Sequence, residues 1–212
     1  TALVNWLFAK GQGGKFVLGA DPSYGSVYSH ATSIKSEAIK VPLLKDYRQD
    51  IAGMIVAANR NARDIGFFYL CNPNNPTGAV VTAKEVKQIV EGIPQDMPIL
   101  IDEAYHHYVD DPAYGTSVPY VLEGRPVIVA RTFSKIAALA AMRVGYAIAP
   151  ADVIQRMRPY TTNASGVNVL AKFAAAASLK DTAGQADIRR KTIALRTSTS
   201  KELEAWGYPV IP

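Results

Sequence analysis

The 212-residue chain has one cysteine, Cys71, and so lacks the pair that an internal disulfide requires. A single thiol suits a reducing compartment, and we expect a cytoplasmic protein. Long hydrophobic runs are also lacking. The longest apolar stretches, such as residues 136–142 and 173–178, fall far short of the roughly 20 residues that a membrane-spanning helix needs. The sequence therefore predicts neither a disulfide scaffold nor a membrane protein, and the fold must depend on an ordinary hydrophobic core.

The charged residues indicate no nucleic-acid partner. The formal net charge is +5, but Lys and Arg are spread over the whole length, and the densest group, residues 189–191, is typical of a solvated helix face. With 49% hydrophobic and 19% charged residues, the composition is that of a globular protein. No linker rich in Ser, Gly or Pro divides the sequence, so we expect one domain.

Short apolar runs alternate with longer amphipathic segments, which is typical of an α/β fold with a mostly parallel sheet. The expected strands cover residues 16–18, 39–41, 66–70, 99–102, 127–131 and 145–149. The expected helices cover residues 50–59, 82–92, 151–157 and 181–206. Polar segments follow four of the strands, at residues 21–25, 72–78, 102–105 and 132–135. Because ligands bind at the carboxyl edge of such sheets, we expect these four segments to meet at one site.

Two of these segments carry an amide and a carboxylate. In residues 71–78 (CNPNNPTG), two prolines and a glycine predict a fixed turn that holds the amide of Asn75 in one direction, although a plain tight turn explains this segment equally well. Asp102 ends an apolar strand, where a buried carboxylate needs a partner. That partner could be a cationic ring nitrogen; the alternative is a helix N-cap.

The third segment, residues 131–135 (RTFSK), places hydroxyl groups beside a lysine, with Arg143 downstream. Thr132, Ser134 and Arg143 are a set suited to phosphate, since arginine binds phosphate oxygens with two parallel hydrogen bonds and hydroxyls add neutral donors. Lys135 can form a Schiff base with an aldehyde. Taken alone, a lysine after a serine is more often a solvated surface residue.

Together, residues 75–78 (NPTG), 102–105 (DEAY) and Ser134-Lys135 with Arg143 resemble the motifs of class I/II aminotransferases of pyridoxal-phosphate fold type I. Residues 24–149 look most like the histidinol-phosphate aminotransferase branch, and the resemblance covers essentially the entire chain. It implies a three-layer α/β/α large domain whose mostly parallel sheet has one antiparallel strand. It also implies that residues 1–212 are an incomplete pyridoxal-phosphate-binding domain, without the N-terminal arm and C-terminal small domain, from a protein that forms a homodimer.

The resemblance implies a role for each matching residue. Lys135 would bind the cofactor, pyridoxal 5'-phosphate, and later move a proton at the substrate Cα, while Asp102 would pair with the ring nitrogen. Asn75 and Tyr105 would hydrogen-bond the phenolic oxygen of the ring. Tyr24 would stack on the ring face, although without the other motifs a core position would be the better interpretation. The implied phosphate set is Thr132, Ser134 and Arg143.

Some residues depart from the family pattern or invite other interpretations. Residues 136–142 lack the glycines that the family commonly has, including one near Ala141, which puts the local backbone path in question. His106 and His107 could suggest a metal site or a general base. Because no Cys or clustered acid stands at ligand spacing, we expect them to be structural and expect no metal. Glu103 is expected to stabilise the turn at the strand end.

The expected activity is a transamination between an amino acid, or an amino-alcohol phosphate such as histidinol phosphate, and a 2-oxo acid. A related amino-acid decarboxylase would use the same Lys135, Asp102 and Arg143, and the sequence does not separate the two. A third interpretation is the ligand-sensing domain of a transcription regulator. The full set of catalytic residues favours an enzyme. In the family, the arginine that binds the substrate carboxylate lies in the small domain, so we expect substrate choice to depend on residues outside this chain.

Overall fold

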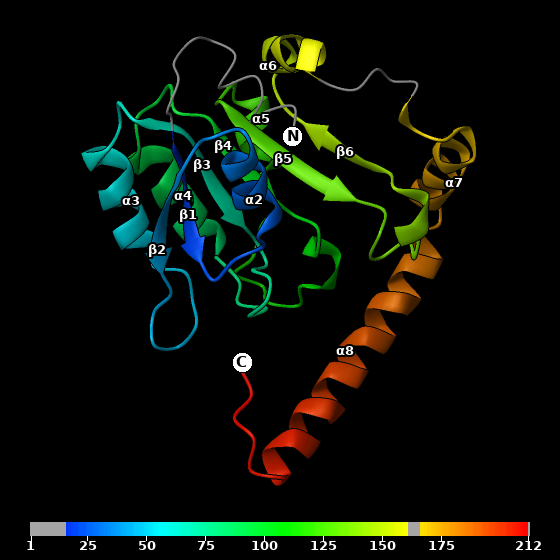
Figure 1. Cartoon of the computed structure of the whole chain (residues 1–212). Coiled ribbons are helices and arrows are strands. Elements are labelled where there is room, and N and C mark those ends of the chain that lie inside the picture. The colour runs from blue at the N-terminus through cyan, green and yellow to red at the C-terminus, as the bar shows by residue number, and fades with distance from the viewer. Residues whose placement is uncertain (1–15, 161–165, 212) are drawn as a thin grey trace.

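The computed structural model describes residues 16–160 and 166–211. At its centre lies a six-stranded sheet with the order β2-β1-β3-β4-β5-β6 (Figure 1). The strands are β1 (Phe16–Asp21), β2 (Ala38–Pro42), β3 (Ile65–Cys71), β4 (Ile99–Asp102), β5 (Val127–Thr132) and β6 (Gly145–Ile148). Neighbouring strands are parallel except β5 and β6, which are antiparallel. This confirms the prediction of a mostly parallel sheet with one antiparallel strand.

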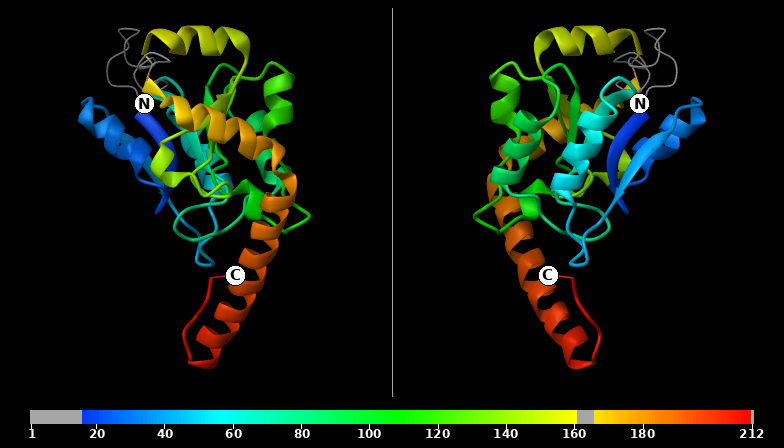
Figure 2. Two further views of the ribbon diagram at one scale, coloured as in Figure 1. Left: turned by 90° about the vertical axis from the view of Figure 1, so that its right-hand side faces the viewer. Right: turned by 90° about the vertical axis from the view of Figure 1, so that its left-hand side faces the viewer.

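Helices cover both faces of the sheet and complete the predicted three-layer arrangement. One face packs against α2 (Ser26–Ser33) and α6 (Ala151–Met157), and the other against α3 (Ile51–Arg60), α4 (Ala83–Gly92) and α5 (Val118–Leu122). The chain continues into α7 (Val169–Lys180) and the long α8 (Thr182–Ala205), which projects beyond the sheet (Figures 1 and 2). No helix among the described residues is both long and apolar enough to cross a membrane.

All the expected strands and the four expected helices are present, with shifted ends; β1, for example, continues to Asp21. Three further helices, α2, α5 and α7, lie outside the four expected ranges. Only Ala171 and Ala175 of α7 are buried, so this alanine-rich helix has no strong hydrophobic periodicity that would mark it in the sequence. The ends of the predicted helices follow from capping. Thr82 and Glu85 form a reciprocal capping box at the start of α4, and the side chain of Asp50 accepts from the Gly53 amide at the start of α3.

Two apolar clusters form the core, one on each face of the sheet. Every residue of β3 is buried, because this strand is central and helices cover both of its faces. Phe68 and Leu70 pack toward α3 and α4, whereas Phe67, Tyr69 and Cys71 pack toward α2 and α6. The same strand thus anchors both layers, and it fixes the position of the loop that follows Cys71.

The strand order also determines where a site can form. The chain passes from β1 outward to β2 and then returns to β3 on the other side of β1. The connections after β1 and β3 therefore leave the sheet in opposite directions, which opens a crevice at their carboxyl ends. The segments after β4 and β5 begin at the same edge of the sheet.

Candidate active site

The loop after β3 is held in shape by two buried asparagines. The side chain of Asn72 donates to the carbonyl of Val81 and accepts from its amide, both at 2.9 Å. The side chain of Asn74 donates to the Thr77 hydroxyl at 3.1 Å and to the Pro22 carbonyl at 3.2 Å. The last contact joins the loops after β1 and β3 across the crevice. With its neighbours fixed in this way, the half-buried Asn75 is free to present its amide to the site.

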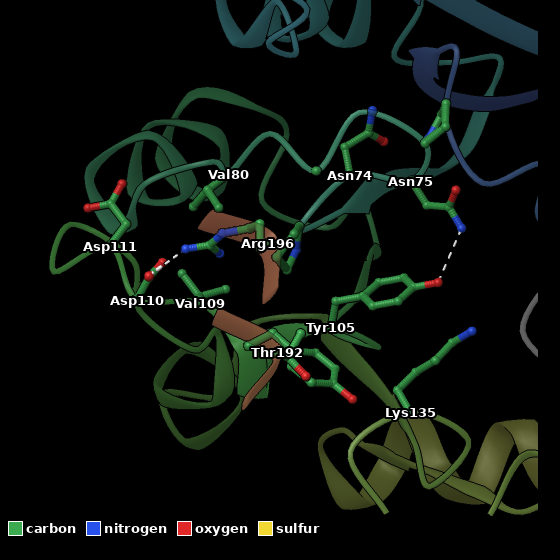
Figure 3. A pocket seen from close by; sticks show the side chains of 14 residues that line it. Asn74, Asn75, Val80, Tyr105, Val109, Asp110, Asp111, Lys135, Thr192 and Arg196 are labelled. Carbon is green, nitrogen blue, oxygen red and sulfur yellow. Dashed lines mark hydrogen bonds and ion pairs between the residues drawn. The ribbon is translucent and has the colours of Figure 1, made fainter. Parts of the chain in front are cut away.

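Three predicted site residues from three different loops lie together. The Asn75 Nδ2 atom donates to the Tyr105 hydroxyl at 3.4 Å. The Lys135 Nζ atom lies 5.1 Å from the centre of the Tyr105 ring. Figure 3 shows the three side chains along one wall of a cavity. The structure thus brings together the amide, the phenol and the amine that the sequence placed after β3, β4 and β5.

Asp102, at the end of β4, lies close to the same group. Its Oδ1 atom accepts a hydrogen bond from the Ala104 amide at 3.0 Å. The pKa of Asp102 is raised, mainly by burial and also by the charge of Glu103, while the Ala104 amide, the Tyr69 hydroxyl and the charge of Lys135 act in the opposite direction. A cation or hydrogen-bond donor placed against Asp102 would therefore stabilise its ionised form, which burial disfavours.

The predicted phosphate set is only partly assembled. The Ser134 amide donates to the Thr132 hydroxyl at 3.0 Å. Antiparallel pairing puts Thr132 opposite Gly145, two residues after Arg143, so the two segments run side by side. The exposed Arg143 guanidinium, however, donates to the carbonyl of Ala140 at 2.8 Å, within its own loop. The backbone of Arg143 is therefore near the hydroxyl pair, while its guanidinium makes a local contact.

Tyr24 is not a core residue, since 45% of it is exposed. It stands in the segment between β1 and α2, immediately after the Pro22–Ser23 turn that Asn74 contacts. The alternative of a tyrosine packed in the core is therefore wrong. The buried tyrosine of this region is Tyr28, whose hydroxyl donates to the Ala20 carbonyl at 2.8 Å.

The loop between Lys135 and Arg143 turns at Ala138 and Arg143, and not at Ala141, near which the family commonly has a glycine. Ala138 and Arg143 adopt left-handed backbone angles, with φ of 54° and 51°. Such angles are uncommon for residues with a side chain. Ala141, where the family commonly has a glycine nearby, lies exposed in the short 3₁₀ helix η2 (Ala140–Met142).

The cavity beside Lys135 has a volume of about 540 Å³. An ion pair between Arg196 of α8 and Asp110, with Nη2 and Oδ2 at 2.5 Å, lines the end of the cavity away from Lys135 (Figure 3). Several of its lining residues were not predicted: Asn74, Val80, Tyr108, Val109, Asp110, Asp111, Thr192 and Arg196. A signal for the α8 residues exists in the sequence, because positions 189, 192 and 196 share one helix face. Arg189 on that face donates to the Val109 carbonyl at 2.7 Å, so it is not purely solvated.

Glu103, which follows Asp102 in the chain, is fully buried and accepts several hydrogen bonds. Arg131 donates to it from Nε and Nη2, and the Thr116 hydroxyl and the Ser117 amide donate as well. The prediction that Glu103 stabilises the strand-end turn is confirmed and extended, because the contacts reach β5 and the segment before α5. The more deeply buried of the two neighbouring acids is thus Glu103, and Arg131 is its cationic partner.

His106 and His107 belong to the 3₁₀ helix η1 (His106–Tyr108), and their ring centres lie 3.7 Å apart. Burial lowers the pKa of both imidazoles, and the positive charge of Arg131 lowers them further; the pKa of His106 falls to about 3. Neutral rings packed on each other fit the structural role that was expected. Within the part of the chain that the structure describes, no group of three or more His, Cys, Asp or Glu residues is arranged to hold a metal ion.

Known proteins resemble this chain in sequence and in fold. The model of the family "Aminotransferase class I and II" matches residues 2–212. A histidinol-phosphate aminotransferase of Moorella thermoacetica is 34% identical over 200 residues, which cover 94% of this chain and 50% of that protein. An aromatic amino acid aminotransferase of Rhodococcus jostii is 38% identical over 176 residues, covering 81% of this chain and 46% of that protein.

A solved structure gives the same result for the fold. Histidinol-phosphate aminotransferase from Sinorhizobium meliloti, in complex with pyridoxal-5'-phosphate, superimposes with a TM-score of 0.88 at 25% identity, over 99% of this chain and 56% of that one. The chain spans about half the length of the curated relatives that it matches. From the family match and these relatives, the chain belongs to the class I and II aminotransferases, close to the histidinol-phosphate branch.

Proposed function

We propose that residues 1–212 form the pyridoxal-phosphate-binding part of a transaminase. The observation that carries the proposal is the meeting of Lys135, Tyr105 and Asn75 at one wall of a cavity, with the charge of Lys135 acting on Asp102. These four side chains come from the carboxyl ends of three neighbouring strands, β3, β4 and β5. An amine, a phenol and an amide that line one cavity, with a buried carboxylate that senses the charge of the amine, fit a ligand site better than a purely structural role.

The residues present fit pyridoxal phosphate by their chemistry. Lys135 offers an amine to the aldehyde, Asp102 a carboxylate to the ring nitrogen, and Tyr105 and Asn75 offer donors to the ring oxygen. The Thr132 and Ser134 hydroxyls, and Arg143 once its guanidinium leaves the Ala140 carbonyl, offer donors to the phosphate. The exposed Tyr24 offers an aromatic face for stacking. When bound, the cofactor supplies a ring that accepts electrons from the substrate α-carbon.

The residues of this chain would then divide the work. Lys135 would move the proton at the substrate α-carbon through its Nζ atom. Its flexible side chain on an exposed loop suits this movement. Asp102 keeps the ring nitrogen protonated, and it can do so only while it is itself ionised. The Ala104 amide, which donates to Asp102, therefore supports catalysis indirectly.

The proposed reaction transfers an amino group between an amino acid, or an amino-alcohol phosphate such as histidinol phosphate, and a 2-oxo acid. Relatives with both histidinol-phosphate and aromatic amino acid names support this class of substrate. A decarboxylase or a ligand-sensing regulator domain is not favoured by any relative given above. Tyr108, Val80 and the Arg196–Asp110 pair line the outer cavity, where the substrate side chain would lie.

The proposal is tested by covalent trapping in the full-length protein. Incubation with pyridoxal phosphate and borohydride should leave a pyridoxyl label on Lys135, located by peptide mass mapping. The Lys135→Ala variant should carry no label there, while Lys172→Ala, which removes an exposed lysine of α7, should be labelled like the wild type. Equal labelling of many lysines, or none in the wild type, contradicts the proposal. Amino-group transfer measured against release of carbon dioxide then separates transaminase from decarboxylase.

We further propose a cytoplasmic homodimer. Exposed apolar side chains support the dimer: Val169, Leu170 and Phe173 near the start of α7 are 63%, 70% and 72% exposed. A cluster of this kind at one end of a helix is typical of a surface that another protein covers. Sedimentation equilibrium should give twice the monomer mass, and Phe173→Asp should lower the association constant. A monomer at micromolar concentration contradicts this proposal.

A further inference from the structure

Beneath the candidate site lies the buried phenol of Tyr69. Tyr69 of β3 is 1% exposed, and its hydroxyl has no hydrogen-bonding partner of good geometry in the described parts of the chain. A buried hydroxyl without a partner is costly, so its presence needs an explanation. The neighbouring Tyr28 packs edge-on against the Tyr69 ring, with ring centres 5.7 Å apart, but its own hydroxyl already bonds to the Ala20 carbonyl.

The sheet register places the Tyr69 side chain on the same face of the sheet as Asp102. In the parallel pair of β3 and β4, Tyr69 lies opposite Leu100 and Cys71 lies opposite Asp102. Residues two apart on a strand share a face, and paired residues of adjacent strands do too. Tyr69, Cys71 and Asp102 therefore face the same side. A diagonal neighbour of this kind is within the reach of a long aromatic side chain.

The electrostatics agree with this placement. The Tyr69 hydroxyl opposes the effect of burial on the pKa of Asp102, and the Asp102 charge in turn raises the pKa of Tyr69, after burial and the effect of Cys71. Tyr69 thus stays protonated and can act as a donor. The other nearby acceptor, the Cys71 sulfur, is weak, and its thiol already donates to the Pro73 carbonyl at 3.4 Å.

We propose that Tyr69 is a positioning residue for Asp102: its hydroxyl donates to the carboxylate from beneath, which keeps that group ionised and directed at the ring nitrogen of the cofactor. This inference rests on the proposed function. It assigns Tyr69 no contact with the cofactor. A small movement of either side chain completes the bond, as is common when a site closes on its ligand.

The test is the affinity of the full-length apoprotein for two ligands. One is pyridoxal phosphate, and the other is its analogue with CH in place of the ring nitrogen, to which Asp102 can give no charge-assisted bond. Tyr69→Phe should weaken the binding of pyridoxal phosphate about tenfold, which is the effect of one hydrogen bond to a charged group. It should change the affinity for the analogue less than about twofold, an effect well below that of one such bond. If Tyr69 had a purely structural role, Tyr69→Phe would weaken the binding of both ligands equally, and that result would overturn the inference.

Tyr28→Phe is the matched control, because it also removes a hydroxyl from this aromatic pair. The hydroxyl of Tyr28, however, donates to the Ala20 carbonyl. It should not distinguish the two ligands. A second measurement uses Asp102→Asn as background, in which Tyr69→Phe should no longer change the affinity for pyridoxal phosphate. A tenfold loss that persists there contradicts the inference. If the wild-type protein fails to bind pyridoxal phosphate at all, the proposed function fails instead.

Discussion

The carboxylate of Glu103 and the guanidinium of Arg131 form a buried ion pair, with Oε2 lying 3.0 Å from Nε and 2.7 Å from Nη2. The Glu103 side chain is fully buried and that of Arg131 is 15% exposed. Glu103 follows Asp102 at the end of β4, and Arg131 lies in β5, which leads to Lys135. The pair therefore links the two segments that carry the carboxylate and the amine of the candidate site.

Glu103→Gln should lower the free energy of unfolding by about 3–5 kcal/mol, because it leaves the Arg131 charge in a buried place without its partner. Urea unfolding followed by circular dichroism measures the change. Asp152→Asn is the matched control, since it breaks an exposed ion pair with Arg156 and should cost less than about 1 kcal/mol. Equal losses in the two variants would show that the buried pair has no special weight.

Gly145→Ala should destabilise the protein by about 1–3 kcal/mol, the usual cost of forcing a group into a packed place. A Cβ atom at Gly145 would lie 2.7 Å from the Arg131 carbonyl oxygen, and this backbone atom of β5 cannot move aside easily. Gly25→Ala is the control, because a Cβ there meets nothing within 4 Å. Thermal unfolding of both variants checks the prediction, which is wrong if Gly145→Ala melts at the wild-type temperature.

Stability should fall as the pH is lowered from about 6.5 toward 3. Burial, with the charges of Arg131 and His107, lowers the pKa of His106 from 6.5 to about 3. Between these values the unfolded chain binds a proton that the native protein does not, so the free energy of unfolding rises with pH, by at most about 1.4 kcal/mol per unit. His106→Phe should reduce this slope in urea titrations at several pH values. An unchanged slope would assign the acid sensitivity to other groups.

Tyr105→Phe should weaken the binding of pyridoxal phosphate about tenfold, because it removes one donor proposed for the ring oxygen. It should leave the free energy of unfolding within about 0.5 kcal/mol, since the one side-chain hydrogen bond of Tyr105 in the described parts of the chain, from Asn75, is long at 3.4 Å. Tyr108→Phe, a change of the same kind at the same cavity, should have little effect on binding. Equilibrium dialysis with the apoprotein compares the two variants. Equal weakening by both contradicts the assignment of Tyr105.

The sequence by itself predicted the sheet and the main residues of the candidate site. Apolar runs marked the six strands, and polar segments after them marked the edge where Asn75, Asp102, Tyr105 and Lys135 meet. This worked because each residue is tied to the end of its own strand, and parallel strands end at one edge. The ranges of α2, α5 and α7 were not predicted, because α2 and α5 are short and the alanine-rich α7 shows no strong amphipathic period.

The tertiary structure alone decided the contacts between segments far apart in the chain. Arg196 and Asp110 are 86 positions apart, and Arg131 and Glu103 are 28 apart, so neither pair forms a local pattern. Tyr69 and Asp102 share one face of the sheet only because of the register between β3 and β4. Local sequence fixes local backbone shape and the identity of each functional group. Which groups become buried partners depends on strand register and helix packing, which the whole chain determines together.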